Sequence, residues 1–191
     1  MTMRCMSLLI LFLCNITLAS EPEPDVYHTI VDQHGNISLP KEYRSGWVHI
    51  GSWLIADTKA PGHGFHDVYM QPEAVKHYRK TGQFPDGTVL VKEVRKIEHG
   101  PKTTGQAQWA GEITIWFVMI KDSKGRFKGN PHWVNGWGWA LFENKGRDGV
   151  ITGKGFAQRN VSDGFVSSCQ GCHTPAKEKD WVFIEGYPSL K

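Results

Sequence analysis

The run Cys169-Gln170-Gly171-Cys172-His173 constrains this chain more than any other feature. Two cysteines three positions apart, followed directly by a histidine, are the attachment pattern of a covalent c-type haem. Each thiol can add to one of the two haem vinyl groups. The adjacent histidine then lies beneath the iron, where its imidazole can serve as the proximal ligand. The pattern predicts haem c as cofactor, attached through Cys169 and Cys172, with His173 as the iron ligand.

Two other kinds of site use a Cys-x-x-Cys pair. A thioredoxin-like redox pair is expected within a βαβ pattern, and none surrounds this motif. A zinc site needs a second half, and the sequence has no second cysteine pair. The two remaining cysteines, Cys5 and Cys14, lie in a leader segment. The haem interpretation is therefore the favoured one.

The first 20 residues are typical of a signal peptide. Arg4 supplies the positive start, an apolar stretch runs from Ser7 to Leu18, and small residues follow it. We expect residues 1–20 to be removed and residues 21–191 to form one haem domain. The apolar stretch is short for a bilayer span, so no membrane insertion is expected after signal removal. Export together with a c-type haem motif indicates the bacterial periplasm.

Charge excludes few functions and favours none. The formal net charge of +3 falls to +2 when Arg4 leaves with the leader. So small an excess gives no reason to expect nucleic acid or a membrane surface as partner. Net charge therefore predicts no nucleic-acid partner and no membrane surface.

The order of elements predicts an α+β domain, a mainly antiparallel β-sheet with a few short helices and one covalently bound haem. Proline at the first turn and glycine at the end predict a helix over Pro72–Thr81. A glycine-rich loop is expected over 60–66 and a short haem-bearing helix over 165–173. Residues rich in β-formers predict strands over 47–56, 68–70, 88–97, 112–121 and 132–142.

The strand over 88–97 holds an unusual lysine. Alternation places Leu90, Lys92 and Val94 on one face and Val89, Val91 and Glu93 on the other. A lysine between two aliphatic residues does not suit a buried face. The pattern alone favours an edge strand whose lysine extends to water.

The strand over 132–142 alternates large with small side chains. Gly136, Gly138 and Ala140 share one face, which lets a flat or bulky group approach closely. A haem and a neighbouring aromatic ring both fit that description. The other face carries Trp133, Trp137, Trp139 and Leu141.

Over most of the mature chain the sequence resembles the cytochrome P-460 family, which includes cytochrome c′-beta. The resemblance implies a homodimer with one c-type haem on a mainly antiparallel sheet. Hydroxylamine-oxidising members carry a lysine covalently joined to the haem edge, and Lys92 falls at the matching position. This reverses the inference from the pattern, because a bonded amine has reason to point inward. The resemblance rests on 39–44, Val68-Tyr69, Pro72-Glu73, Lys80-Thr81-Gly82, 86–93, 121–124, 169–173, 180–183 and Tyr187-Pro188.

The resemblance implies hydroxylamine oxidation to nitrous oxide or nitric oxide at a five-coordinate haem, with a soluble cytochrome c as electron acceptor. Lys92 would adjust the haem electronically, and His66 could relay protons. His66 stands where the hydroxylamine-oxidising members carry arginine. Their acidic group above the iron has two candidates here, Glu112 and Asp163.

Two other functions stay open at this stage. A cytochrome c′-beta-like protein would bind nitric oxide in an apolar pocket without turnover. A simple electron-transfer cytochrome would close the sixth iron position with a methionine, for which Met70 and Met119 are the candidates in the mature chain. An unmodified Lys92 would favour the first of these two functions.

Overall fold

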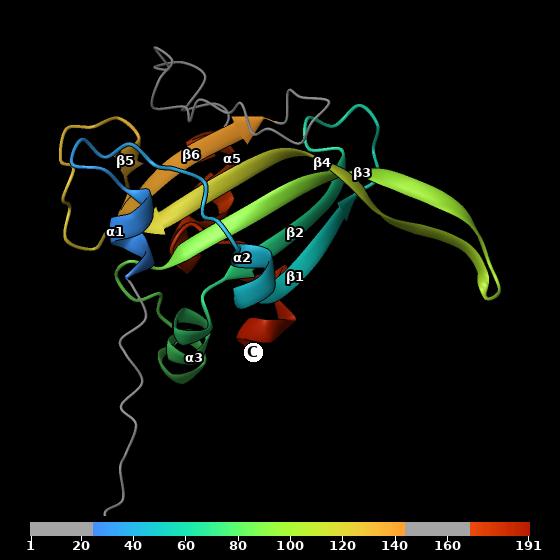
Figure 1. Cartoon of the computed structure of the whole chain (residues 1–191), viewed down its shortest axis with the longest axis horizontal. Coiled ribbons are helices and arrows are strands. Elements are labelled where there is room, and N and C mark those ends of the chain that lie inside the picture. Colours follow the sequence, from blue (N-terminus) through green and yellow to red (C-terminus); the bar gives the residue numbers. More distant parts are fainter. Residues whose placement is uncertain (1–24, 144–168) are drawn as a thin grey trace, which may run out of the picture.

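One antiparallel sheet carries the fold in the computed structural model, which describes residues 25–143 and 169–191 (Figure 1). Six strands of the described residues are ordered β1-β2-β3-β4-β6-β5. Every neighbouring pair is antiparallel, so the predicted α+β class is confirmed. The strands are β1 (Val48–Ile55), β2 (Gly64–Met70), β3 (Val89–Lys102), β4 (Gly105–Lys121), β5 (Trp133–Val134) and β6 (Trp137–Glu143).

The helices of the described residues are short, and the longest of them lies where the sequence predicts a helix over Pro72–Thr81. Of the helix predicted over 165–173, residues 165–168 lie outside the described residues, and α5 covers Gly171–His173. Helix α3 spans Pro72–Thr81, with proline in its first turn and Gly82 at its C-cap with φ of 71°. The α-helices of the described residues are α1 (Val26–Ile30), α2 (Tyr43–Gly46), α3 and α5 (Gly171–His173). Three 3₁₀ turns follow α5, namely η3 (Thr174–Lys179), η4 (Ile184–Gly186) and η5 (Pro188–Leu190). No helix of the described residues is long and apolar enough to cross a membrane.

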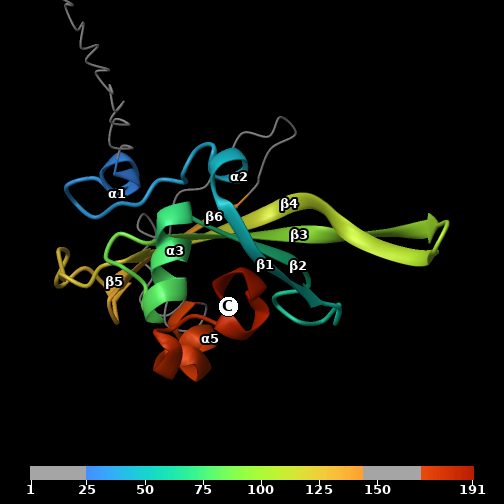
Figure 2. The same cartoon turned by 90° about the horizontal axis from the view of Figure 1, so that it is seen from below.

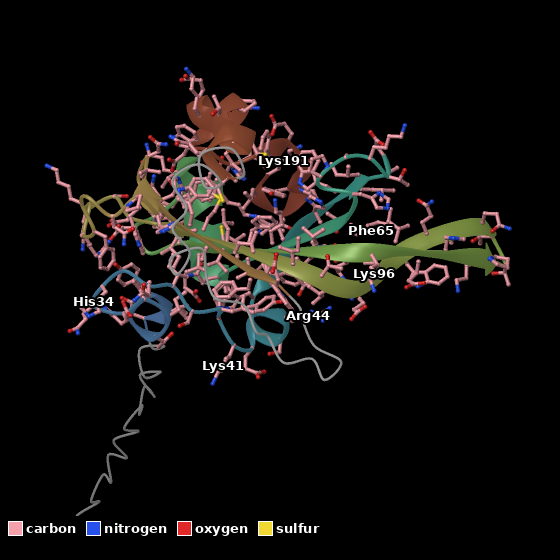
Figure 3. All side chains as sticks on the ribbon, turned by 90° about the horizontal axis from the view of Figure 1, so that it is seen from above. His34, Lys41, Arg44, Phe65, Lys96 and Lys191 are labelled. Carbon is pink, nitrogen blue, oxygen red and sulfur yellow. The ribbon has the colours of Figure 1, made fainter. Side chains whose placement is uncertain are left out.

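The two faces of the sheet are covered by different parts of the chain (Figure 2). Helices α1 and α2 lie on one face, where Tyr27, Ile30 and Tyr43 pack with Val89 and Val91. Helix α3 and the C-terminal segment, residues 169–191, contribute to the core on the other face. Figure 3 shows this division, with Arg44 and Lys191 labelled on opposite sides of the sheet.

The C-terminal segment lies directly on β1 at Gly51. A Cβ added there would stand 2.1 Å from the carbonyl oxygen of Gly186, so no side chain fits at this point of contact. Glycine at position 51 therefore allows the segment that carries the haem motif to lie directly against the backbone of the sheet.

Strand β2 begins earlier than the sequence predicts. The expected loop over 60–66 is wrong for its last three residues, which belong to β2; all three pair with β1, and Phe65 and His66 also pair with β3. Phe65 lies opposite Leu54 of β1 and Arg95 of β3. Hydrogen bonding on both sides outweighs the loop preference of the local glycines. As a result, His66 is held on a rigid strand.

Strands β3 and β4 extend well beyond their predicted ends. β2 pairs with β3 as far as Arg95, and β6 pairs with β4 from Ile115 onwards. The remaining residues form a two-stranded arm that projects from the sheet (Figures 1 and 2). We call residues 96–112 the β3–β4 arm.

The predicted strand over 132–142 is a hairpin instead. Asn135 and Gly136 both have positive φ, which is the backbone of a tight two-residue turn between β5 and β6. The ring of Trp133 consequently folds over Gly138, where an added Cβ would come within 2.6 Å of it. A neighbouring aromatic ring therefore lies against the small-residue face at Gly138.

Candidate haem site

Lys92 points inward from the middle of the sheet. β3 lies between β2 and β4, and Lys92 is opposite Val68 on one side and Phe117 on the other. The edge-strand prediction is therefore wrong. The Lys92 amine lies 4.4 Å from the centroid of the Phe117 ring. Within residues 25–143 and 169–191 it has no hydrogen bond or ion pair. Burial lowers the pKa of Lys92, and the nearby Cys169 and Cys172 act in the opposite direction.

The haem motif begins the C-terminal segment and faces the same core. Cys169 is buried and Cys172 is exposed, and neither forms a disulfide. Burial raises the pKa of the Cys169 thiol to about 11, while the charge of Lys92 acts to lower it. The motif therefore presents two separate thiols, Cys169 in the core and Cys172 at the surface.

The His173 ring is held in one tautomer. Its Nδ1 lies 2.6 Å from the carbonyl oxygen of Trp181. A carbonyl can only accept, so Nδ1 donates its hydrogen and Nε2 keeps a free lone pair. The rings of Trp139 and Phe183 flank the imidazole at centroid distances of 5.0 and 5.3 Å. Burial lowers the pKa of His173 to about 4, with a smaller contribution from the Lys92 charge. A neutral imidazole with a free Nε2 is the form that binds iron.

The fold brings Lys92, Cys169, Cys172, His173 and His66 together from distant parts of the chain. The amine of Lys92 interacts electrostatically with each of the other four. Lys92 and His66 lie on the same face of the sheet, and the C-terminal segment brings the motif to that face. The two site regions that the sequence predicts separately thus form one site.

His66 also has a defined tautomer. Its Nε2 donates to the carbonyl oxygen of Gly62 at 2.6 Å, which leaves Nδ1 as an acceptor. Burial, followed by the positive charge of Lys92, lowers the pKa of His66 below its ordinary value of 6.5. The ring is therefore neutral near pH 7 and can accept a proton at Nδ1.

The other candidates from the sequence have different outcomes. Glu112 is wrong as an acidic group above the iron, because it is exposed on the β3–β4 arm and pairs with Lys96 at 2.6 Å. Asp163 lies outside the described residues. Met70 and Met119 are both buried in the core cluster that contains Cys169.

A buried carboxylate behind Lys92 was not singled out from the sequence. Glu93 is fully buried on the opposite face of β3. It accepts hydrogen bonds from the Tyr43 hydroxyl at 2.5 Å and from Nη1 of Arg95 at 3.0 Å. Nε of Arg44 lies 3.3 Å away, and the Trp116 indole donates to the Tyr43 hydroxyl. The sequence does contain a signal for this buried carboxylate, because Glu93 shares its strand face with the aliphatic residues Val89 and Val91.

These residues fit a c-type haem. The site offers two thiols that form no disulfide, an imidazole with an available nitrogen, and aromatic surfaces from Trp139, Phe183 and Phe117. In the described part of the chain, no group of three or more His, Cys, Asp or Glu side chains could hold a metal ion by itself.

Comparison with known families decides the assignment. The family model for cytochrome P460 matches residues 40–184, a span that includes Lys92 and the haem motif. The chain belongs to the cytochrome P460 family. Membership implies a haem cofactor and supports a c-type haem protein. A search of curated proteins found no match.

Proposed function

We propose that this cytochrome P460 protein oxidises hydroxylamine at a haem that Cys169, Cys172 and Lys92 all bond covalently. The observation that carries the proposal is the Lys92 amine. It lies on an apolar face, without a polar partner among the described residues, beside both thiols and His173. Lys92 is partly buried, and an ammonium withdrawn from water without a polar partner is costly. A neutral nitrogen bonded to the porphyrin edge removes that cost.

Each residue has a chemical task in this proposal. The thiols of Cys169 and Cys172 would add to the haem vinyl groups, and Nε2 of His173 would hold the iron. A haem, when bound, supplies an open coordination position and one-electron redox chemistry. Because the Lys92 pKa is lowered, its amine loses its proton more readily than an exposed lysine, and the neutral form is the one that a bond to the porphyrin edge would require. The Nδ1 atom of His66 can take up a proton released by the substrate.

Electrons taken from hydroxylamine must leave the protein. We propose a soluble cytochrome c as the acceptor and the periplasm as the compartment, since signal peptide and haem motif both favour export. The product is nitrous oxide or nitric oxide. These assignments follow from the chemistry expected of the site and from the N-terminal sequence.

We also propose that the protein works as a homodimer. An isolated two-stranded hairpin is marginally stable in water, and the β3–β4 arm has no further strand paired to its outer edges within the described residues. Trp109 on the arm is 38 % exposed. The arm carries Lys96 and Lys102 together with Glu98 and Glu112, so its charges balance and the arms of two copies could meet without net repulsion.

Acceptor reduction by the haem-loaded protein tests the proposed function. With hydroxylamine and an oxidised c-type cytochrome, the wild type should turn over and release a nitrogen oxide. Lys92→Met should load haem through its cysteines yet lose that turnover. Lys96→Met, on the same strand but exposed, should behave like the wild type.

The same preparation distinguishes the two other functions. A wild-type protein that binds nitric oxide reversibly but never reduces the acceptor would be a binding protein of the cytochrome c′-beta kind. A low-spin ferric spectrum with a sulfur-to-iron band would identify methionine ligation and a simple electron carrier. Either result would contradict the proposed enzyme.

A further inference from the structure

The turn at Asp180 and Trp181 has an uncommon backbone. Both residues have positive φ, 53° and 65°, a region that residues other than glycine seldom adopt. The amide of Trp181 donates to the carbonyl oxygen of Ala176 at 2.9 Å. This conformation directs the Trp181 carbonyl toward Nδ1 of His173. Two successive residues in this region persist only where the surroundings hold them.

The surroundings that hold the turn belong to the sheet. Oδ1 of Asp180 accepts from Nζ of Lys121 at 2.7 Å and from Nε1 of Trp137 at 3.2 Å. Lys121 and Trp137 are cross-strand partners on β4 and β6. The Lys121 side chain is only 12 % exposed, and its amine lies 4.9 Å from the Trp137 ring centroid. We call Asp180, Lys121 and Trp137 the Asp180 clamp.

We propose that the Asp180 clamp positions His173 as an iron ligand. The clamp fixes the turn, the turn presents the Trp181 carbonyl, and the carbonyl fixes the tautomer and direction of the imidazole. A hydrogen-bond acceptor at Nδ1 also makes Nε2 a stronger donor to a metal. Asp180, Lys121 and Trp137 are thus positioning residues that act through a backbone carbonyl.

The inference rests on the role of His173 in the proposed function and on no other part of it. The clamp would act in the same way in an enzyme, a nitric oxide binder or an electron carrier. Its test can therefore fail while hydroxylamine oxidation stands, and the reverse also holds.

Two variants disrupt the clamp and leave at position 180 a residue type that tolerates positive φ. Asp180→Asn keeps a residue that tolerates this backbone but loses the charge that pairs with Lys121. Lys121→Met keeps an unbranched side chain and leaves Asp180 in place. Glu185→Gln is the matched control, since it removes an exposed ion pair with Lys179 in the same segment.

The readouts are the iron–histidine stretching frequency of the ferrous holoprotein, by resonance Raman, and the midpoint potential. A weaker acceptor at Nδ1 makes His173 a poorer donor, which disfavours the ferric state. Asp180→Asn and Lys121→Met should each lower the frequency and raise the potential. The double variant, Asp180→Asn with Lys121→Met, should change the frequency and the potential no more than the single variant with the larger effect. Lys121→Arg, which keeps a cation at position 121, should show a smaller change than Lys121→Met. Glu185→Gln should match the wild type.

The outcomes separate the two proposals. If the wild type shows an iron–histidine band that neither clamp variant moves, the clamp is overturned and His173 remains the ligand. The clamp is also overturned if Glu185→Gln shifts the band as far as Asp180→Asn. If the wild type has no such band, the role of His173 fails and the clamp fails with it.

Discussion

Replacing Glu93 with alanine tests whether the buried ion cluster behind Lys92 stabilises the fold. The carboxylate has no solvent exposure and accepts from the Tyr43 hydroxyl and from Arg95. Removing it leaves the Arg95 cation, 16 % exposed, without the carboxylate at 3.0 Å. Among the described residues, the Gly111 carbonyl oxygen at 2.8 Å and the Asp67 carboxylate at 3.9 Å then remain near the guanidinium. Breaking a buried pair in this way costs about 3–5 kcal/mol. Arg44 is half exposed and adds little. We expect Glu93→Ala to lose about 4 kcal/mol of unfolding free energy.

Urea unfolding of the haem-loaded protein, followed by circular dichroism, measures this loss. The control is Glu112→Ala, which removes an exposed ion pair with Lys96 on the arm of the same two strands. That variant should lose far less unfolding free energy than Glu93→Ala, because water screens an exposed ion pair. A double-mutant cycle between Glu93 and Arg95 isolates their coupling. Equal losses in the two alanine variants, at unchanged dependence on urea, would refute the reasoning.

Three further predictions follow from the site, the core and the arm. The kcat/KM for hydroxylamine should rise with pH through an inflection below 6.5, because the His66 pKa is lowered and only the neutral ring accepts a proton. His66→Gln should abolish that inflection in a pH–rate profile, and an unchanged profile would exclude the relay. Gly51→Val should cost about 1–3 kcal/mol in urea unfolding, since its Cβ meets the Gly186 carbonyl; wild-type stability would contradict that contact. Shortening the β3–β4 arm should convert a dimer to a monomer in sedimentation while leaving the haem spectrum intact, and a persistent dimer would place the interface elsewhere.

The fold could be predicted where local signals and tertiary contacts agree. Helix α3 has its proline, its C-cap glycine and an apolar face, and it lies where expected. The β3–β4 arm was missed because Gly100 and Pro101 look like strand breakers. In the structure Pro101 pairs with Gln106 near the tip of the arm, where proline's missing amide is tolerated.

The site could be predicted in its parts but not in its assembly. The haem motif is local, and alternation placed Lys92 on the face opposite Glu93. Alternation could not identify which face the C-terminal segment covers, nor that β3 lies in the interior of the sheet. The hydrogen bond that fixes His173 uses the backbone carbonyl of Trp181, and any residue at that position has a carbonyl. Side-chain identity therefore carries no signal for it.

Tryptic mass spectrometry of the native protein tests the central claim, the bond between Lys92 and the haem, most directly. Trypsin does not cleave after a lysine whose side-chain amine is covalently bonded to a ring carbon of the haem. We therefore predict a single species that joins a peptide of residues 81–95, uncleaved at Lys92, through the haem to the peptide of residues 160–177. Recovery of residues 81–92 as an unmodified peptide, separate from the haem peptide, would contradict the account.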